Sequence, residues 1–329
     1  MTGGTHGVGG TGPPDSVVAT TDRIAFIDVM RTIAVLRVVL YHALLWQWLT
    51  WFEAMPVMFF VSGTLVGRSL AGRPWRSVVS GRVRRLALPL LVYLGFALTA
   101  QLSGLMGSTT IHLWYVWSFL GFTVISPPLV WLVRRAPVPT VVVIVAAITA
   151  LTLIGPGDSG VGAAYLLAWV AGLWWADRGC PFPPLGALVA VIVVGVTVSV
   201  LAVANLVGLS LQQSPSGVGL SMAGLGAAWL SLGLIFRHQL GVLAGLPRVG
   251  PAVRFMSRRL LTIYLWHIPA TIVARRVVET LDVTGGALWV VLVLALTGAL
   301  TALATVVLGP LEDRAAASSR RARQRATDG

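Results

Sequence analysis

The stretch that decides the fold is residues 26–48, which read FIDVMRTIAVLRVVLYHALLWQW. It is long enough to cross a bilayer as one helix, since a spanning helix needs about 20 mostly apolar residues. It nevertheless contains Asp28, Arg31, Arg37 and His42. Ionisable side chains at membrane depth cost several kcal/mol and usually serve a function. We therefore expect this segment to be both a membrane helix and part of a functional site.

The spacing of Arg31 and His42 supports this expectation. The two residues are eleven positions apart, and eleven steps of about 100° amount to roughly three full turns of a helix. Both side chains would then lie on one helix face, roughly 16 Å apart along the axis. One face would carry a cation toward one membrane surface and a titratable base toward the other.

The composition predicts a multi-pass integral membrane protein. Hydrophobic residues make up 56% of the 329 residues and charged residues 11%, and the mean hydropathy is +0.85. All 24 basic residues are arginines clustered between apolar runs, which membrane topology explains better than nucleic-acid binding. The single cysteine, Cys180, excludes an intramolecular disulfide, and we predict no metal site because no Cys/His cluster has suitable spacing.

The lengths of the apolar runs predict an all-α fold of about ten transmembrane helices. The predicted spans are residues 25–48, 54–71, 86–106, 113–133, 138–154, 161–176, 185–207, 218–236, 257–276 and 286–309. With both termini in the cytoplasm, twenty of the 24 arginines fall on the cytoplasmic side, as the positive-inside rule requires. In this orientation Arg31 lies toward the cytoplasm and His42 toward the outer leaflet.

One membrane domain accounts for most of the chain. We assign residues 23–310 to it, residues 1–22 to a disordered cytoplasmic N-terminal tail, and residues 311–329 to a disordered arginine-rich cytoplasmic tail. The first tail lacks the basic segment and cleavage site of a signal peptide. The arginine-only basic content suggests a bacterial genome, and hence the bacterial inner, or plasma, membrane.

Several short motifs, in order, resemble the membrane acyltransferase-3 family. The first helix of that family carries an arginine, ten residues and a histidine, as Arg31 and His42 do here. Further similar segments follow in the family's order and together extend over about residues 24–310: MPVMFFVSG at 55–63, RVRRLALP at 82–89, HLWY at 112–115 and YLWHIP at 264–269. The sequence Ala54-Met55-Pro56 stands where many relatives have one like Gly-Val-Asp, which points to a separate subgroup.

The resemblance implies an O-acyltransferase with acyl-CoA, most simply acetyl-CoA, as donor co-substrate and no bound cofactor. The acceptor would be a hydroxyl of a glycan, lipid or secondary metabolite, including those of the cell envelope. It also implies site residues. His42, Arg31 and His267 would be catalytic, Arg31, Arg82 and Arg85 would bind the donor, and Asp28, Trp114 and Tyr264 would bind substrate.

Each of these residues also has a structural explanation. His42 could be a packing histidine instead of a general base, and Arg31 could be only the helical ion-pair partner of Asp28. His267 could make a structural hydrogen bond, and Trp114 could belong to an interfacial aromatic belt. Much of the arginine run from Arg68 to Arg85 fits contact with anionic lipids. Ser62-Gly63 fits close helix packing better than a nucleophile.

A different class of function also fits the intramembrane charges. Transporters place Arg, Asp and His along substrate or proton pathways, but their inverted repeats are not evident in this sequence. A purely structural membrane protein would leave Arg31 and His42 unexplained. Direct transfer and transfer through a covalent acyl intermediate both remain open at this stage.

Overall fold

The computed structural model describes residues 15–103, 110–155, 158–206, 215–314 and 317. Within these ranges the chain is helical and holds no strand. Twelve α-helices follow one another along it: α1 (Asp15–Leu44), α2 (Ala54–Leu70), α3 (Trp75–Leu102), α4 (Trp114–Arg135), α5 (Pro137–Ile154), α6 (Val161–Asp177), α7 (Leu185–Leu206), α8 (Gly219–Ile235), α9 (Arg237–Gly245), α10 (Val249–Arg258), α11 (Leu260–Thr280) and α12 (Gly286–Leu308). Short 3₁₀ helices occupy Gln47–Trp51, Ile111–Leu113 and Pro215–Gly217.

The all-helical class is confirmed for the described residues, and each of the ten predicted apolar ranges overlaps an α-helix. By length and composition, six helices of the described chain could cross a membrane, or seven if α8 and α9, which are bent by 63°, form one broken span. The less apolar α1 and α11, which carry the charged and histidine residues of interest, are not among them. The count of ten spans and the cytoplasmic placement of the termini stay predictions.

Two boundaries of the expected domains differ from the structure. Helix α1 begins at Asp15, inside the predicted N-terminal tail, and residues 1–14 of that tail lie outside the described residues. At the other end, residues 311–314 are helical and Glu312 is buried, so the predicted disordered tail begins too early. The rest of that tail, apart from residue 317, is not described.

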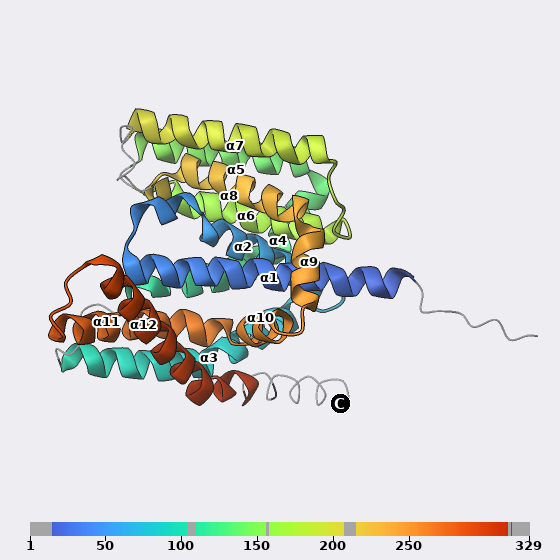
Figure 1. The fold of residues 1–329 in the computed structure, drawn as a ribbon. Helices are drawn as coiled ribbons and strands as arrows, with labels where there is room; N and C mark the ends of the chain where they lie inside the picture. Colours follow the sequence, from blue (N-terminus) through green and yellow to red (C-terminus); the bar gives the residue numbers. More distant parts are fainter. Residues whose placement is uncertain (1–14, 104–109, 156–157, 207–214, 315–316, 318–329) are drawn as a thin grey trace, which may run out of the picture.

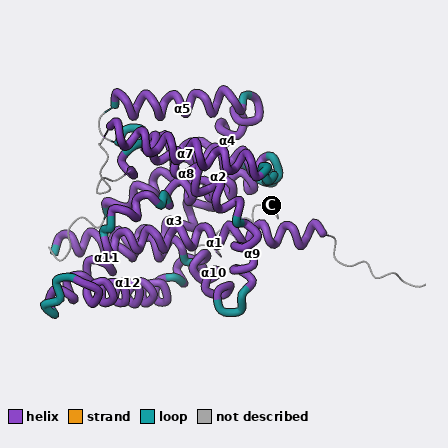
Figure 2. The backbone as a smooth tube through the Cα atoms, turned by 45° about the horizontal axis from the view of Figure 1, so that its top comes forward, coloured by secondary structure: helices purple, strands orange, loops and turns teal. Residues whose placement is uncertain are grey.

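Helix α1 lies between two groups of helices. Figures 1 and 2 show α2, α5, α7 and α8 on one side of it and α11 and α12 on the other. Helices α2 and α6 pack more closely against each other than any other pair of helices in the described residues. A side chain at Gly63 of α2 would come within 2.3 Å of the Trp169 carbonyl oxygen, and one at Gly172 of α6 within 2.1 Å of the Phe60 carbonyl oxygen. Glycines allow this approach, which confirms the packing role expected for Gly63.

Candidate active site

A pocket lined by arginines opens where six helices meet, namely α1, α2, α3, α4, α10 and α11. It has a volume of about 160 Å³. Arg31 comes from α1, Arg82 and Arg85 from α3, Tyr115 from α4 and Tyr264 from α11. We call it the arginine pocket. The three arginines that the sequence singled out as donor-binding residues therefore line one cavity, although Arg31 and Arg82 are 51 positions apart in the sequence.

Arg31 is held in this pocket by a short polar chain from two helices. Asp28 lies one turn before it, with 3.8 Å between Arg31 Nη1 and Asp28 Oδ1. Ser257 of α10 donates a hydrogen bond to Asp28 Oδ1 (2.6 Å) and accepts a long one from Arg31 Nη1 (3.5 Å). Asp28 itself does not line the pocket, whereas Ser257 does. Asp28 thus lies behind Arg31 and orients it, and the expected direct contact of Asp28 with substrate has no support in this arrangement.

The pocket has spare hydrogen-bond donors. Arg31 Nε and Arg82 Nε are both buried and have no hydrogen-bond partner among the described residues. The Arg82 guanidinium lies 5.7 Å from the centre of the Phe119 ring. Buried donors of this kind are costly to leave unpaired, and planar guanidinium groups match phosphate and carboxylate oxygens. The pocket is therefore suited to an anion.

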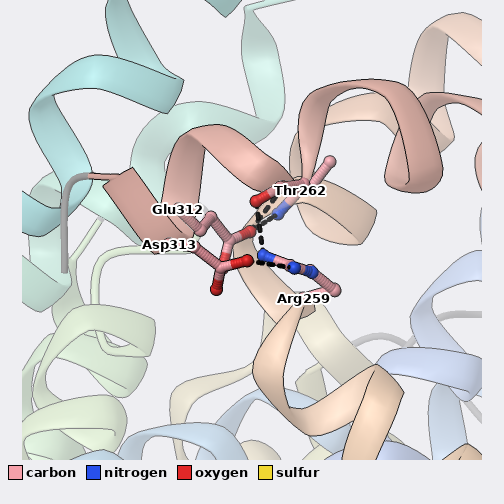
Figure 3. Close-up of polar contacts among 5 residues, drawn as sticks. Arg259, Thr262, Glu312 and Asp313 are labelled. Atoms are coloured by element: carbon pink, nitrogen blue, oxygen red, sulfur yellow. Dashed lines mark hydrogen bonds and ion pairs between the residues drawn. The ribbon is translucent and has the colours of Figure 1, made fainter. Parts of the chain in front are cut away.

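The far end of the chain contributes an acidic residue that the sequence did not indicate. Glu312, just beyond α12, lines the arginine pocket. Its Oε1 accepts hydrogen bonds from the backbone N–H of Thr262 (2.7 Å) and from the Thr262 hydroxyl. Next to it, Arg259 donates to the Gly309 carbonyl and to Asp313, as Figure 3 shows for its bond to Asp313. Because Thr262 lies in the first turn of α11, Glu312 caps that helix and fixes it to α12.

Three histidines form a second cluster around His42, near the C-terminal end of α1. His267 Nε2 lies 3.3 Å from His42 Nδ1, and the ring centres of these two residues are 5.0 Å apart. The ring of His112 lies 5.6 Å from that of His267. His267 and His112 are buried, with exposures of 0% and 4%. In the described residues, no three His, Cys, Asp or Glu side chains are grouped so that they could hold a metal ion.

Backbone carbonyls determine which nitrogens of this pair carry a proton. His267 Nδ1 lies 2.6 Å from the Tyr264 carbonyl oxygen, and His42 Nδ1 lies 2.9 Å from the Val38 carbonyl oxygen. A carbonyl oxygen can only accept, so Nδ1 carries the hydrogen in both rings. The Nε2 lone pair of His267 then faces the Nδ1–H of His42. In its neutral form, His42 keeps an Nε2 lone pair, which is the part of imidazole that acts as a base.

Arg275 of α11 supports His42 from the end of its helix. Its Nη2 donates to the carbonyl oxygens of Ala43 (2.9 Å) and His42 (3.2 Å). These are among the carbonyls that have no partner within a helix at its C-terminus, and a cation there also interacts favourably with the helix dipole. No local pattern connects Arg275 with His42, since 233 positions separate them.

Tyr264 connects the two clusters. Its ring lines the arginine pocket, its hydroxyl donates to the His112 carbonyl, and its own carbonyl accepts from His267. His42 does not line the arginine pocket, and the eleven positions from Arg31 place it roughly 16 Å farther along α1. The structure therefore arranges the predicted residues as a cationic pocket and a histidine cluster joined through Tyr264.

Trp114 is the predicted site residue that lies apart from both clusters. It stacks on Tyr165, with ring centres 5.1 Å apart and 13° between the ring planes, and it is 39% exposed. Its neighbour Tyr115 lines the arginine pocket instead. His112, two positions earlier, joins the histidine cluster. Trp114 thus does not line the arginine pocket, and its role in binding substrate stays a prediction.

Comparison with known proteins identifies the family of this chain. Residues 24–308 match the acyltransferase domain of the acyltransferase-3 family. No curated protein and no solved structure matches the chain. The matched region contains Arg31, His42, Arg82, Arg85 and His267. It covers well over half of the chain, and the chain therefore belongs to the acyltransferase-3 family and is a membrane acyltransferase.

Proposed function

We propose that this protein transfers an acyl group from cytoplasmic acyl-CoA to a hydroxyl of a glycan, lipid or secondary metabolite, and that it acts in the bacterial plasma membrane. Acetyl is the simplest acyl group to consider. The observation that carries the proposal is the arrangement along α1. A pocket lined by four arginines, Arg31, Arg82, Arg85 and Arg258, lies at one end of the stretch from Arg31 to His42. A histidine pair that includes His42 lies farther along the same helix.

The arginine pocket has the chemistry that coenzyme A requires. The phosphates of coenzyme A are anions, and Arg31 and Arg82 have buried Nε–H groups without partners among the described residues. Coenzyme A carries its thioester at the end of a long pantetheine arm. With the phosphates held by Arg31, Arg82 and Arg85, that arm would extend past Tyr264 and bring the thioester toward His42.

His42 would then act as the general base. Its Nε2 takes the proton of the acceptor hydroxyl while that oxygen attacks the thioester carbonyl carbon. A C–O bond forms and the C–S bond breaks. The coenzyme A thiolate then leaves and receives the proton from His42. General-base catalysis of this kind contributes about 10²- to 10⁴-fold in rate, and the Val38 carbonyl, which accepts from His42 Nδ1, stabilises the imidazolium that forms.

Membrane vesicles from the producing cells provide the test, because they bring the unknown acceptor with them. The vesicles are incubated with acetyl-CoA radiolabelled in the acetyl group, and label in hydroxylamine-sensitive esters is counted. We expect label with the wild-type protein and none above background with His42→Ala at equal protein level. Label that accumulates inside the vesicles without ester formation would favour the transporter.

A binding experiment with a matched control variant tests the role of the arginine pocket. Arg82→Ala should weaken binding of acetyl-CoA to the purified protein by about 1.5–3 kcal/mol, the range for hydrogen bonds to charged groups. Arg73 belongs to the same arginine-rich region but lines a different cavity, with Trp75 and Arg134. Arg73→Ala should therefore leave binding nearly unchanged. Equal losses in both variants would mean that the phosphates bind elsewhere.

A further inference from the structure

A second cavity lies on a different face of α1. It has a volume of about 340 Å³, which is within the usual size of small-molecule sites, roughly 300–1,000 Å³. Helix α1 lines it with Met30, Ile33 and Arg37, which lie roughly 100° to 160° round the helix from Arg31. The other walls are the start of α2, the end of α8, and α9. We call this cavity the α1–α8 groove. None of its lining residues belongs to the arginine pocket.

The α1–α8 groove is apolar except for one pair of opposite charges, Arg37 and Glu53. Arg37 Nε donates to the Leu49 carbonyl (2.9 Å), while its Nη2 is buried without a hydrogen-bond partner among the described residues. Glu53 is only 2% exposed and accepts from the Ser216 hydroxyl (2.8 Å). In the described chain, no ion pair joins Arg37 to Glu53. The groove thus holds an unused donor close to a carboxylate.

Aromatic residues lie at the end of the groove that holds Arg37 and Glu53, which we call its polar end. The rings of Phe52 and Trp229 stack at 4.6 Å between centres, and Trp229 Nε1 donates to the Trp51 carbonyl (2.8 Å). Tryptophan and tyrosine concentrate where a membrane meets water. From there the groove continues past Met30 toward Phe236 and Leu240, where α9 crosses α1 (Figure 1). A polar end with two charged residues and an apolar remainder match the headgroup and the hydrocarbon chain of a lipid.

We propose that the α1–α8 groove binds a lipid of the surrounding bilayer that has a neutral, hydroxyl-bearing headgroup. A hydroxyl both donates and accepts, so it satisfies Glu53 and Arg37 Nη2 together. An anionic headgroup would meet the charge of Glu53, and a cationic one that of Arg37. The hydrocarbon chain lies along Ile33 and Phe236, which are 53% and 46% exposed and open the groove toward the bilayer. The lipid is accessory and not a substrate, because the groove and His42 lie on different faces of α1.

The proposal can be tested in nanodiscs of phosphatidylcholine with 1-monooleoylglycerol as the probe. We expect saturable binding of one molecule per protein. Methyl oleate, which accepts but cannot donate, and oleic acid, which is anionic, should bind at least tenfold more weakly. Non-saturable uptake, or equal binding of methyl oleate, would mean that the groove makes only non-specific contact with lipid. Tighter binding of oleic acid would contradict the preference for a neutral headgroup.

Two tryptophan substitutions on α1 locate the binding. Ile33 lines the groove and is exposed, so Ile33→Trp should fill its mouth without disturbing the core, and should abolish saturable binding. Leu36 is 43% exposed and lies outside the groove, so Leu36→Trp should bind the probe as the wild type does. Unchanged binding by Ile33→Trp would place the site elsewhere. If acetyl-CoA converts the bound probe to its acetate ester, the groove is an acceptor site and the accessory role is wrong.

Discussion

At the scale of single residues, His267 helps to hold the His42 ring in place. Its Nε2 faces the Nδ1 atom of His42 at 3.3 Å, so removing the His267 ring takes away one contact of His42 Nδ1 and keeps that to the Val38 carbonyl. We expect His267→Ala to lower kcat on the order of 10²-fold, a usual cost of a misplaced catalytic group, with acetyl-CoA affinity unchanged. Ester formation and equilibrium binding, measured on the same preparations, check both parts.

Two variants separate this positioning role from simple packing. His267→Gln keeps an oxygen that can accept from His42 Nδ1, so it should retain more activity than His267→Ala. Thr271→Val alters another buried side chain of α11 (4% exposed) and should stay close to wild type. If His267→Gln and His267→Ala are equally impaired, the hydrogen bond to His42 is not what matters.

At the scale of helices, Arg275 stabilises the end of α1 that carries His42. It donates to the carbonyls of His42 and Ala43, which would otherwise lack partners at the helix C-terminus. Arg275→Gln should lower stability by about 1–2 kcal/mol, observed as a lower melting temperature by tryptophan fluorescence. Arg84, which is exposed on α3, is the control, and Arg84→Gln should melt near the wild-type temperature. Equal melting of the two variants would contradict the capping role.

Glu312 joins two helices and also faces the arginine pocket, and these roles can be separated. Glu312→Ala removes the cap on Thr262 and should lower stability by about 0.5–2 kcal/mol. Glu312→Gln keeps an accepting oxygen, so its stability should be near wild type. Removing the negative charge should leave acetyl-CoA binding unchanged or tighter in both variants. Weaker binding by Glu312→Gln would show instead that the carboxylate recognises the donor.

At the scale of the whole molecule, the sequence was informative where the signal is local. Runs of apolar residues predicted the helices because hydropathy depends only on neighbouring positions. The spacing of Arg31 and His42, and of Arg82 and Arg85, was also local. Contacts between distant segments had no such signal. Nothing near Glu312 predicts that it reaches Thr262, 50 positions earlier, and nothing near Trp114 shows that Tyr115 and His112 face the site.

The same reasoning explains why the short helices α9 and α10 were missed. Residues 237–256 are too polar to span a membrane and lie between two predicted spans. The structure folds them into α9 and α10. Helix α10 then supplies Ser257, which bonds to Asp28, and α9 closes one end of the α1–α8 groove. Their importance comes from tertiary contacts with α1.

Helix α1 connects the donor end of the protein to the catalytic end, and this separation should be visible in kinetics. Arg31→Lys keeps the charge but loses the planar fork of donors, so apparent affinity for acyl-CoA should fall roughly tenfold while the acceptor KM changes little. Loss of a base that acts only in the transition state should lower kcat and kcat/KM together. His42→Ala should therefore bind acyl-CoA normally while failing to transfer the acyl group.

Bisubstrate kinetics on Arg31→Lys and equilibrium binding to His42→Ala test whether the two residues have separate roles. If Arg31→Lys binds donor normally, or His42→Ala does not bind it, the two residues form one site in spite of the roughly 16 Å of helix between them.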